Sequence, residues 1–90
     1  MEIEFKSGAL DDIEFWKRSG NTIIQNRITA LLLSISATPE NGIGKPERLK
    51  GNLSGFWSRR INKIHRIVYA FDPVSQIVTI YSLKDHYKKL

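Results

Sequence analysis

Three side chains in the second half of this chain have types that could bind an anion or move a proton: Glu47, Arg66 and His86. Arg66 lies within the apolar residues 64–71, where an arginine is unfavourable unless it is paired, reaches an anionic ligand or extends its head into water. The imidazole of His86 is the side-chain type suited to proton transfer near neutral pH. For each of the three, a surface position without a chemical role is the competing interpretation.

A run of aromatic and basic residues, Phe56-Trp57-Ser58-Arg59-Arg60, lies shortly before Arg66. Aromatic rings and guanidinium planes stack on RNA bases, and arginine also binds phosphate, so this composition suits RNA. For the two rings we favour a place in the core. For the two arginines, RNA contact and simple solvation both stay open.

Positive charge is concentrated in the same half of the chain. The net charge is +5, and residues 46–90 hold nine of the 14 basic and three of the nine acidic side chains. Such a balance indicates a polyanionic partner, with nucleic acid first, and a solvated basic surface is the alternative. The basic residues on the predicted strands or at their edges are Lys50, Arg59, Arg60, Arg66 and Lys84. Of these, we predict that Lys50, Arg59, Arg60 and Lys84 contact RNA.

The residues present argue against several other classes of site. The chain has no cysteine, and its two histidines are 21 residues apart, so we expect no metal site and no cofactor. Gly42-Ile43-Gly44 lacks the third glycine of a dinucleotide site. No apolar run approaches the roughly 18 residues that span a bilayer, and the N-terminus lacks a signal-peptide pattern. We therefore expect a cytoplasmic protein without a membrane partner.

These side chains need a scaffold, and the first half of the chain predicts a short strand followed by two helices. Residues 2–6 alternate between polar and apolar, as in a half-buried strand. Residues 7–19 carry apolar side chains at every third position and end at a glycine. Residues 22–38 have the strongest helical pattern, with Asn21 or Thr22 as the cap.

After a loop at residues 39–46 the pattern becomes strand-like. Extended segments are predicted at residues 48–50, 55–61, 64–71 and 76–83. Helices first and strands later indicate an α+β domain, in which an antiparallel meander of three or four strands follows the helices. The helices should pack on one sheet face and leave the other for solvent or a ligand. Ninety residues are enough for a single domain, residues 1–90.

Residues 44–61 (GKPERLKGNLSGFWSRRI) resemble the signature of the YoeB/Txe-type toxins of the RelE/ParE superfamily. Residues 65–69 (HRIVY) and the late His86-Tyr87 pair continue the resemblance in order, as does Trp16 in the first predicted helix. The resemblance covers essentially the whole chain, and its central block is long and specific. It implies a RelE-like, microbial-RNase-like fold, which agrees with the element order predicted above.

The resemblance also implies a function. Proteins of this kind are toxins of bacterial type II toxin–antitoxin pairs, and they are ribosome-dependent endoribonucleases that cut mRNA in the A site without a metal, which inhibits translation. The implied partners are an acidic and partly disordered cognate antitoxin, the 70S ribosome with its mRNA, and operator DNA through the antitoxin complex only. A homodimer is compatible with the resemblance.

By position, the family's functional residues fall on Glu47, Arg66, His86 and Tyr87, and its auxiliary basic residues on Lys50 and Arg60. Cleavage by attack of the ribose 2′-OH on phosphorus needs a base, an acid and positive charge near the phosphate. The resemblance implies that Glu47 is the base, His86 the acid and Arg66 the group that stabilises phosphate charge. Tyr87 would orient the substrate or stack on it.

Two features depart from the family pattern. Asp85 stands where a neutral or aromatic residue is more common, and Lys88-Lys89-Leu90 follow the His-Tyr pair with which relatives commonly end. Neither removes an implied catalytic side chain, so we expect activity. Two other functions stay open, namely a module that occupies the ribosome or RNA without cutting, and a protein that acts only as a corepressor with its antitoxin.

Overall fold

The structure is a computed structural model that describes residues 1–86. Along the chain the elements are β1 (Glu2–Phe5), α1 (Ser7–Ser19), α2 (Thr22–Ala37), β2 (Glu47–Arg48), the 3-10 helix η1 (Gly51–Leu53), β3 (Trp57–Arg60), β4 (Arg66–Asp72) and β5 (Ile77–Ser82). The predicted α+β class and the order of helices and strands are confirmed. Neither α-helix in this part of the chain has the length and apolar character needed to cross a membrane.

The two helices begin and end where local chemistry favours it. At the start of α2 the side chain of Asn21 accepts a hydrogen bond from the backbone N–H of Ile24, 3.0 Å away, which satisfies one of the free donors of the first turn. Gly20 ends α1 in the left-handed conformation, with a φ of 70°, which glycine adopts without strain. The buried side of α2 consists of Ile28, Leu31 and Ile35, which recur at the helical spacing of the predicted pattern.

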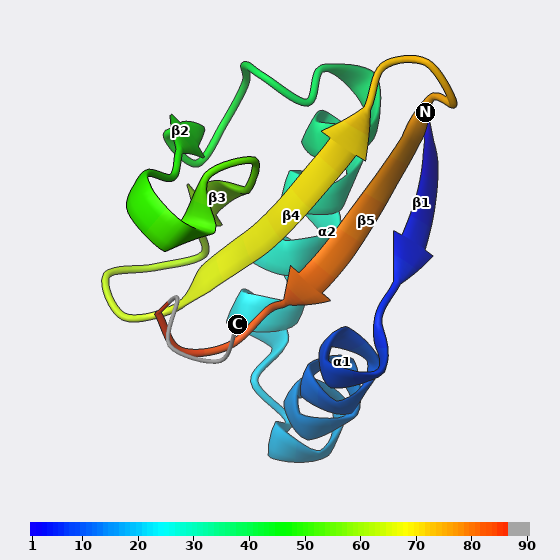
Figure 1. The fold of residues 1–90 in the computed structure, drawn as a ribbon. Coiled ribbons are helices and arrows are strands. Elements are labelled where there is room, and N and C mark those ends of the chain that lie inside the picture. The colour runs from blue at the N-terminus through cyan, green and yellow to red at the C-terminus, as the bar shows by residue number, and fades with distance from the viewer. Residues whose placement is uncertain (87–90) are drawn as a thin grey trace.

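The sheet has five strands in the order β1-β5-β4-β3-β2 (Figure 1). All neighbouring pairs are antiparallel except β1 and β5, which run parallel, with Ile3 opposite Val78. The sheet is therefore mixed, whereas the sequence led us to expect an antiparallel meander. The chain start is fixed in this position because the N-terminal ammonium donates to the carbonyl oxygen of Ser36 (2.9 Å), and the Ser36 hydroxyl donates to that of Met1 (2.8 Å).

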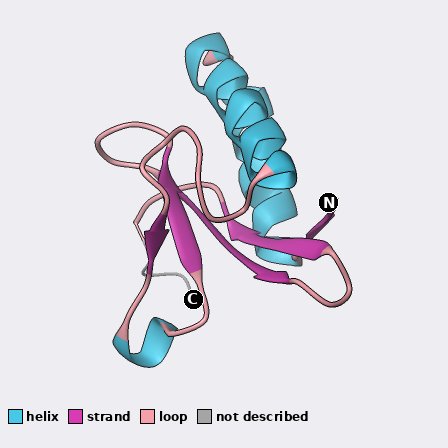
Figure 2. Ribbon diagram, turned by 90° about the horizontal axis from the view of Figure 1, so that it is seen from above, coloured by secondary structure: helices cyan, strands magenta, loops and turns pink. Residues whose placement is uncertain are grey.

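Both α-helices lie on one side of the sheet, as Figure 2 shows from above. The core between them and the strands includes Trp16 from α1, Leu31 from α2, Tyr69 from β4 and Ile80 from β5. Alternation along a strand sends every second side chain to the opposite side. We call that side the helix-free face; it carries Glu47, Ser58, Arg60, Arg66 and Val68.

Candidate active site

The register of three strands places the predicted site residues on the helix-free face. Glu47 of β2 is opposite Ser58 of β3, and two residues further along β3, Arg60 is opposite Arg66 of β4. Directly paired residues point to the same side of a sheet. Neighbouring strands are about 4.8 Å apart, so the backbones of β2 and β4 are separated by about 10 Å. Long side chains can bridge that distance around one phosphodiester group.

Among the predicted site residues on this face, Arg66 is the most deeply buried, with 8% of its surface exposed. Its Nη1 donates to backbone carbonyl oxygens of the loop between β3 and β4, at 2.9 Å from Asn62 and 3.2 Å from His65. Within residues 1–86, all of its side-chain hydrogen bonds leave from Nη1, and it forms no ion pair with a carboxylate. In the described part of the chain the charge of Arg66 thus meets neutral oxygens, and its two other nitrogens are donors suited to binding an anion.

The residues after β5 run beside Arg66. The backbone N–H of Arg66 donates to the carbonyl oxygen of Asp85, 3.0 Å away, which fixes that stretch against the start of β4. His86 is the next residue and is exposed. Asp85, the residue before His86, therefore lies at the same end of β4 as Arg66.

Glu47 and Lys50 approach the same face from the sheet edge. Glu47 is exposed on the two-residue strand β2, and Lys50 is the exposed residue that caps η1. Arg60 is exposed as well. On its β2–β4 half the helix-free face thus carries the carboxylate of Glu47 and the cations of Arg60 and Arg66.

Arg59 does not belong to this face, although the sequence led us to propose it as an RNA-binding residue. It is fully buried under the helices, where its guanidinium donates to the hydroxyl groups of Tyr69 (3.1 Å) and Ser34 (2.6 Å). It also donates to the carbonyl oxygens of Thr38 (2.6 Å) and Asn41 (2.9 Å). Arg59 therefore holds the loop after α2, and we leave it out of the proposed RNA contacts.

The remaining predicted residues lie at or beyond the end of the described chain. The ammonium of Lys84 packs 4.4 Å from the ring centroid of Phe15 and 3.8 Å from a carboxylate oxygen of Asp85, with a quarter of its side chain exposed. Tyr87, predicted to contact the substrate, and the added Lys88-Lys89-Leu90 lie outside the described residues.

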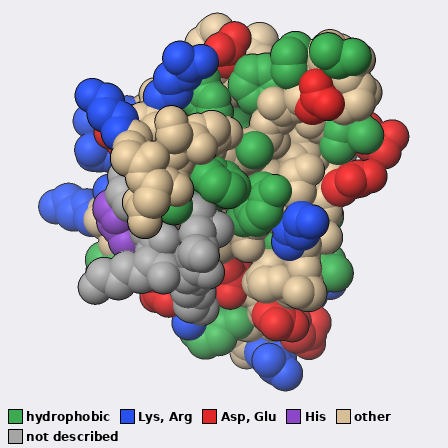
Figure 3. Space-filling model, viewed as in Figure 1, with side chains coloured by type: hydrophobic (Ala, Val, Ile, Leu, Met, Phe, Trp, Pro, Cys, Tyr) green, Lys and Arg blue, Asp and Glu red, His purple; other side chains and the backbone are tan. Residues whose placement is uncertain are grey.

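Charge is separated across the helix-free face. Figure 3 shows lysine and arginine side chains gathered on the side where β2 and η1 lie, next to a histidine, and acidic side chains on the opposite side. The exposed basic residues of the first side are Lys45, Arg48, Lys50, Arg60 and Lys63. On the opposite side, Glu2 and Glu4 are exposed on the edge strand β1. A polyanion would be drawn to the first side only.

A hollow of about 520 Å³ lies near the edge of the sheet, lined in part by Glu40, Arg48, Trp57 and Phe71. Glu47, Arg66 and His86 are not among its lining residues. Among residues 1–86 there is no group of three His, Cys, Asp or Glu side chains placed to hold a metal ion.

The mixed five-stranded sheet, the two helices on one face and the cationic site on the other define a small RelE-like α+β toxin domain. Comparison with known proteins gives the family. The model of the YoeB-like toxins of bacterial type II toxin–antitoxin systems matches residues 5–87. The chain belongs to this YoeB family, which confirms the resemblance noted in the sequence.

Individual relatives match along nearly the whole chain. Toxin YoeB of Streptomyces coelicolor is 41% identical over 87 residues, which are 97% of this chain and 100% of that protein. A solved YoeB/ParE toxin from Agrobacterium tumefaciens superposes with a TM-score of 0.90 at 37% identity, covering 97% of this chain and 100% of that one. A chain of the heterotetrameric YoeB–YefM complex from Staphylococcus aureus superposes with a TM-score of 0.83 at 40% identity, covering 97% and 98%.

Proposed function

We propose that this toxin is a ribosome-dependent endoribonuclease that cuts mRNA in the A site and so inhibits translation. The observation that supports the proposal is the backbone hydrogen bond from Arg66 to Asp85, because it holds the residue before His86 at the start of β4, and the strand register puts Arg66 on the same face as Glu47. A base, an acid and a phosphate-binding cation are the groups that cleavage by 2′-OH attack requires.

In the proposed reaction each group has one task. The carboxylate of Glu47 takes the proton from the ribose 2′-OH, whose oxygen bonds to the adjacent phosphorus. The bond from phosphorus to the leaving 5′-oxygen breaks, and the imidazolium of His86 gives that oxygen a proton. The products are a cyclic 2′,3′-phosphate and a 5′-hydroxyl. Arg66 stabilises the charge on the phosphate oxygens, for which the two nitrogens not used in the loop contacts are suited.

The surrounding cations would hold the RNA. Lys50 and Arg60 are exposed on the same side of the molecule as Glu47 and contribute attraction to phosphates without sequence preference. Lys84 keeps a quarter of its side chain exposed and is retained in the proposed contact set. Tyr87 would orient the substrate or stack on it.

The partners proposed for this chain follow from its relatives. A YoeB–YefM complex and a YoeB dimer have been solved from Staphylococcus aureus. We infer that a cognate antitoxin, acidic and partly disordered, binds this toxin in the cytoplasm and carries the pair to operator DNA. A homodimer is proposed on the same basis.

Two other functions would use the same surface. The protein would either occupy the ribosome or RNA without cutting, or act only as a corepressor with its antitoxin. To separate them, RNA ends are mapped in a reconstituted translation reaction and on the same mRNA free in solution. New ends at A-site codons on ribosomes only would support the nuclease. Translation arrest without new ends would support the binding module. If the protein causes neither arrest nor new ends, the corepressor function is supported.

A further inference from the structure

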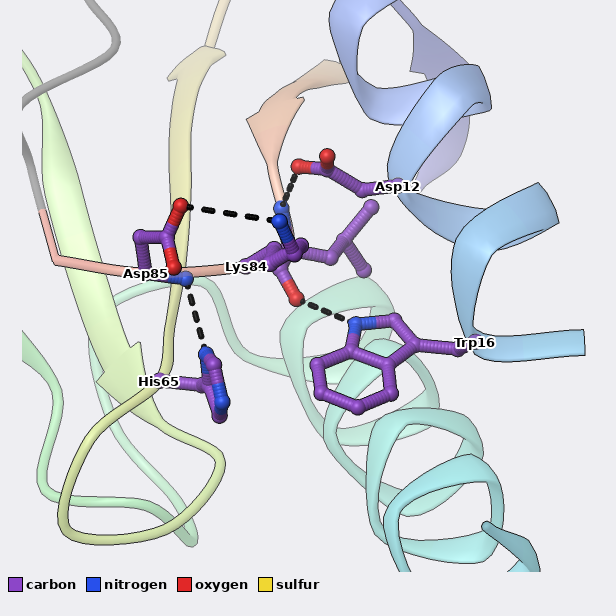
Figure 4. A network of polar contacts seen from close by, with 6 residues as sticks. Asp12, Trp16, His65, Lys84 and Asp85 are labelled. Carbon is purple, nitrogen blue, oxygen red and sulfur yellow. Dashed lines mark hydrogen bonds and ion pairs between the residues drawn. The ribbon is translucent and has the colours of Figure 1, made fainter. Parts of the chain in front are cut away.

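The segment that carries His86 is held by α1 and by the two residues where β4 begins. Strand β5 ends at Ser82, and both backbone groups of the next residue, Leu83, are bound by α1. The N–H of Leu83 donates to the carboxylate of Asp12 (2.9 Å), and its carbonyl oxygen accepts from the indole N–H of Trp16 (2.8 Å). Asp12, Trp16 and Leu83 are all buried, so these bonds are shielded from water. Figure 4 shows both contacts.

Asp85 is held by hydrogen bonds to two consecutive residues, His65 just before β4 and Arg66 at the start of β4. Its N–H donates to Nδ1 of His65 (2.8 Å), and its carbonyl oxygen accepts from the N–H of Arg66 (3.0 Å). Asp85 has a φ of 60°, the left-handed conformation that aspartate tolerates better than most residues. The chain therefore turns at Asp85, and the two bonds on either side of that turn fix the direction in which His86 leaves.

Trp16, which binds Leu83, and His65, which binds Asp85, are in contact with each other. The rings of Trp16 and His65 meet edge to face with their centroids 4.9 Å apart (Figure 4). Since Nδ1 of His65 accepts a hydrogen bond from a backbone N–H, the imidazole must carry its proton on Nε2. We refer to Asp12, Trp16 and His65 together as the tail clamp. It joins α1, the loop before β4 and the residues that precede His86.

We propose that the tail clamp positions His86 for proton transfer to the leaving oxygen, so that Asp12, Trp16 and His65 are positioning residues of the reaction. The inference rests on the proposed nuclease function. None of the three has a catalytic role in the mechanism above; each acts on the backbone of Leu83 or Asp85. A shift of about 1 Å in a reacting group is enough to lower a rate by about 100-fold.

His65 offers a test in which packing and hydrogen bonding are separated. His65→Phe keeps a ring against Trp16 but removes the acceptor, whereas His65→Asn loses the ring and keeps an acceptor near the position of Nδ1. Trp16→Phe removes the other donor while keeping an aromatic ring. Asp12→Ala and Asp11→Ala form a matched pair, because both remove one carboxylate from α1 but Asp11 is exposed.

Amide hydrogen exchange on the full-length toxin measures how firmly the tail clamp holds the Asp85 amide, and it requires no RNA. His65→Phe should speed exchange of the Asp85 amide by about 10-fold, the size expected from losing one hydrogen bond, and leave Ile67 in the core unchanged. His65→Asn should restore most of the protection. Unchanged exchange at Asp85 in His65→Phe, or equal acceleration at Ile67, would overturn the clamp.

Cleavage of ribosome-bound mRNA under single-turnover conditions then tests the role in the reaction. At saturating toxin the rate should fall by about 100-fold in His65→Phe and Asp12→Ala, recover in His65→Asn and stay unchanged in Asp11→Ala, while the half-saturating concentration stays within about two-fold. Equal losses in Phe and Asn variants would overturn the positioning role. Absence of cutting by the wild type would overturn the nuclease proposal itself, and the exchange result would then still report whether the clamp exists.

Discussion

Arg60 and Arg66 lie directly opposite each other on the antiparallel strands β3 and β4. The Cβ atoms of two residues paired in this way are about 5 Å apart, and two like charges at such positions destabilise the sheet. In residues 1–86 neither guanidinium forms an ion pair with a carboxylate. A phosphate between the two cations would relieve this repulsion, and we therefore propose that the pair contacts the RNA backbone.

The first prediction follows from this pair. Arg60→Gln should leave the fold unchanged or stabilise it slightly, by a few tenths of a kcal/mol, and weaken ribosome or RNA binding with a decrease of about one in the salt slope. The measurement is binding affinity between about 50 and 200 mM salt. Lys17→Gln is the control, because it makes the same charge change on α1 and should not alter the slope. An Arg60→Gln slope equal to that of the wild type would contradict the assignment.

The second prediction concerns Arg59 and separates the two adjacent arginines. Arg59→Met removes the donors to Tyr69, Ser34 and three loop carbonyl oxygens, all of which stay in place. We expect a loss of about 3 kcal/mol or more in the free energy of unfolding by urea. Arg60→Met, on the exposed side, should change it by less than about 0.5 kcal/mol. Similar losses in the two variants would show that burial of Arg59 does not matter.

Much of the fold was predictable because it rests on local patterns. The helical period of α2 predicted which of its sides is buried. The alternation of β4 predicted that Arg66 and Ile67 lie on different faces of the sheet, which agrees with the strand register. The pairing of β1 was not predictable from these patterns. Alternation in residues 2–6 identifies a strand but contains nothing about its partner, and the parallel contact with β5 depends on where the helices return the chain.

The site was predicted by resemblance more fully than by pattern. Alternation alone separates Arg59 from Arg60, yet it does not reveal which side the helices cover, so Arg59 was placed with the RNA contacts. His65 was an unremarkable strand residue in the sequence. Its role as acceptor for Asp85 depends on two residues 20 positions apart and could not be read from spacing.

The third prediction tests the loop that leads to Glu47. Gly44 has a φ of 83°, and a Cβ added there would lie 2.5 Å from a methyl carbon of Leu31. Gly55 has a φ of 98° and open space around it. Gly44→Ala should therefore lower the free energy of unfolding by about 3 kcal/mol, and Gly55→Ala by about 1 kcal/mol from backbone strain alone. Urea unfolding measures both, and equal losses would refute the steric account.

The fourth prediction is a pH dependence. Burial raises the pKa of the Tyr69 phenol above its ordinary value of 10.0, and the neighbouring Arg59 opposes that shift. Because the folded pKa is raised, the contribution of Tyr69 to stability is fully present below pH 10.0 and is lost as the pH rises through the folded value. Urea midpoints should fall more steeply above pH 10.0 in the wild type than in Tyr69→Phe.

The Tyr69→Phe variant also has a cost at neutral pH. It loses the donation from the phenol to the carbonyl oxygen of Pro39 (2.5 Å) and the acceptor for Arg59. We expect a loss of about 1–3 kcal/mol at pH 7. Identical alkaline slopes for the two proteins would mean that another group causes the loss of stability.

The central claim is that Glu47 acts as the base in RNA cleavage on the helix-free face. The most direct measurement is single-turnover cutting of an mRNA held on ribosomes, by wild type and by Glu47→Gln, with the RNA ends identified chemically. We predict A-site cuts with cyclic 2′,3′-phosphate and 5′-hydroxyl ends for the wild type, and a rate lower by about 100-fold or more for Glu47→Gln with unchanged ribosome binding. Cutting by Glu47→Gln at the wild-type rate, or arrest by the wild type without new ends, would contradict the account.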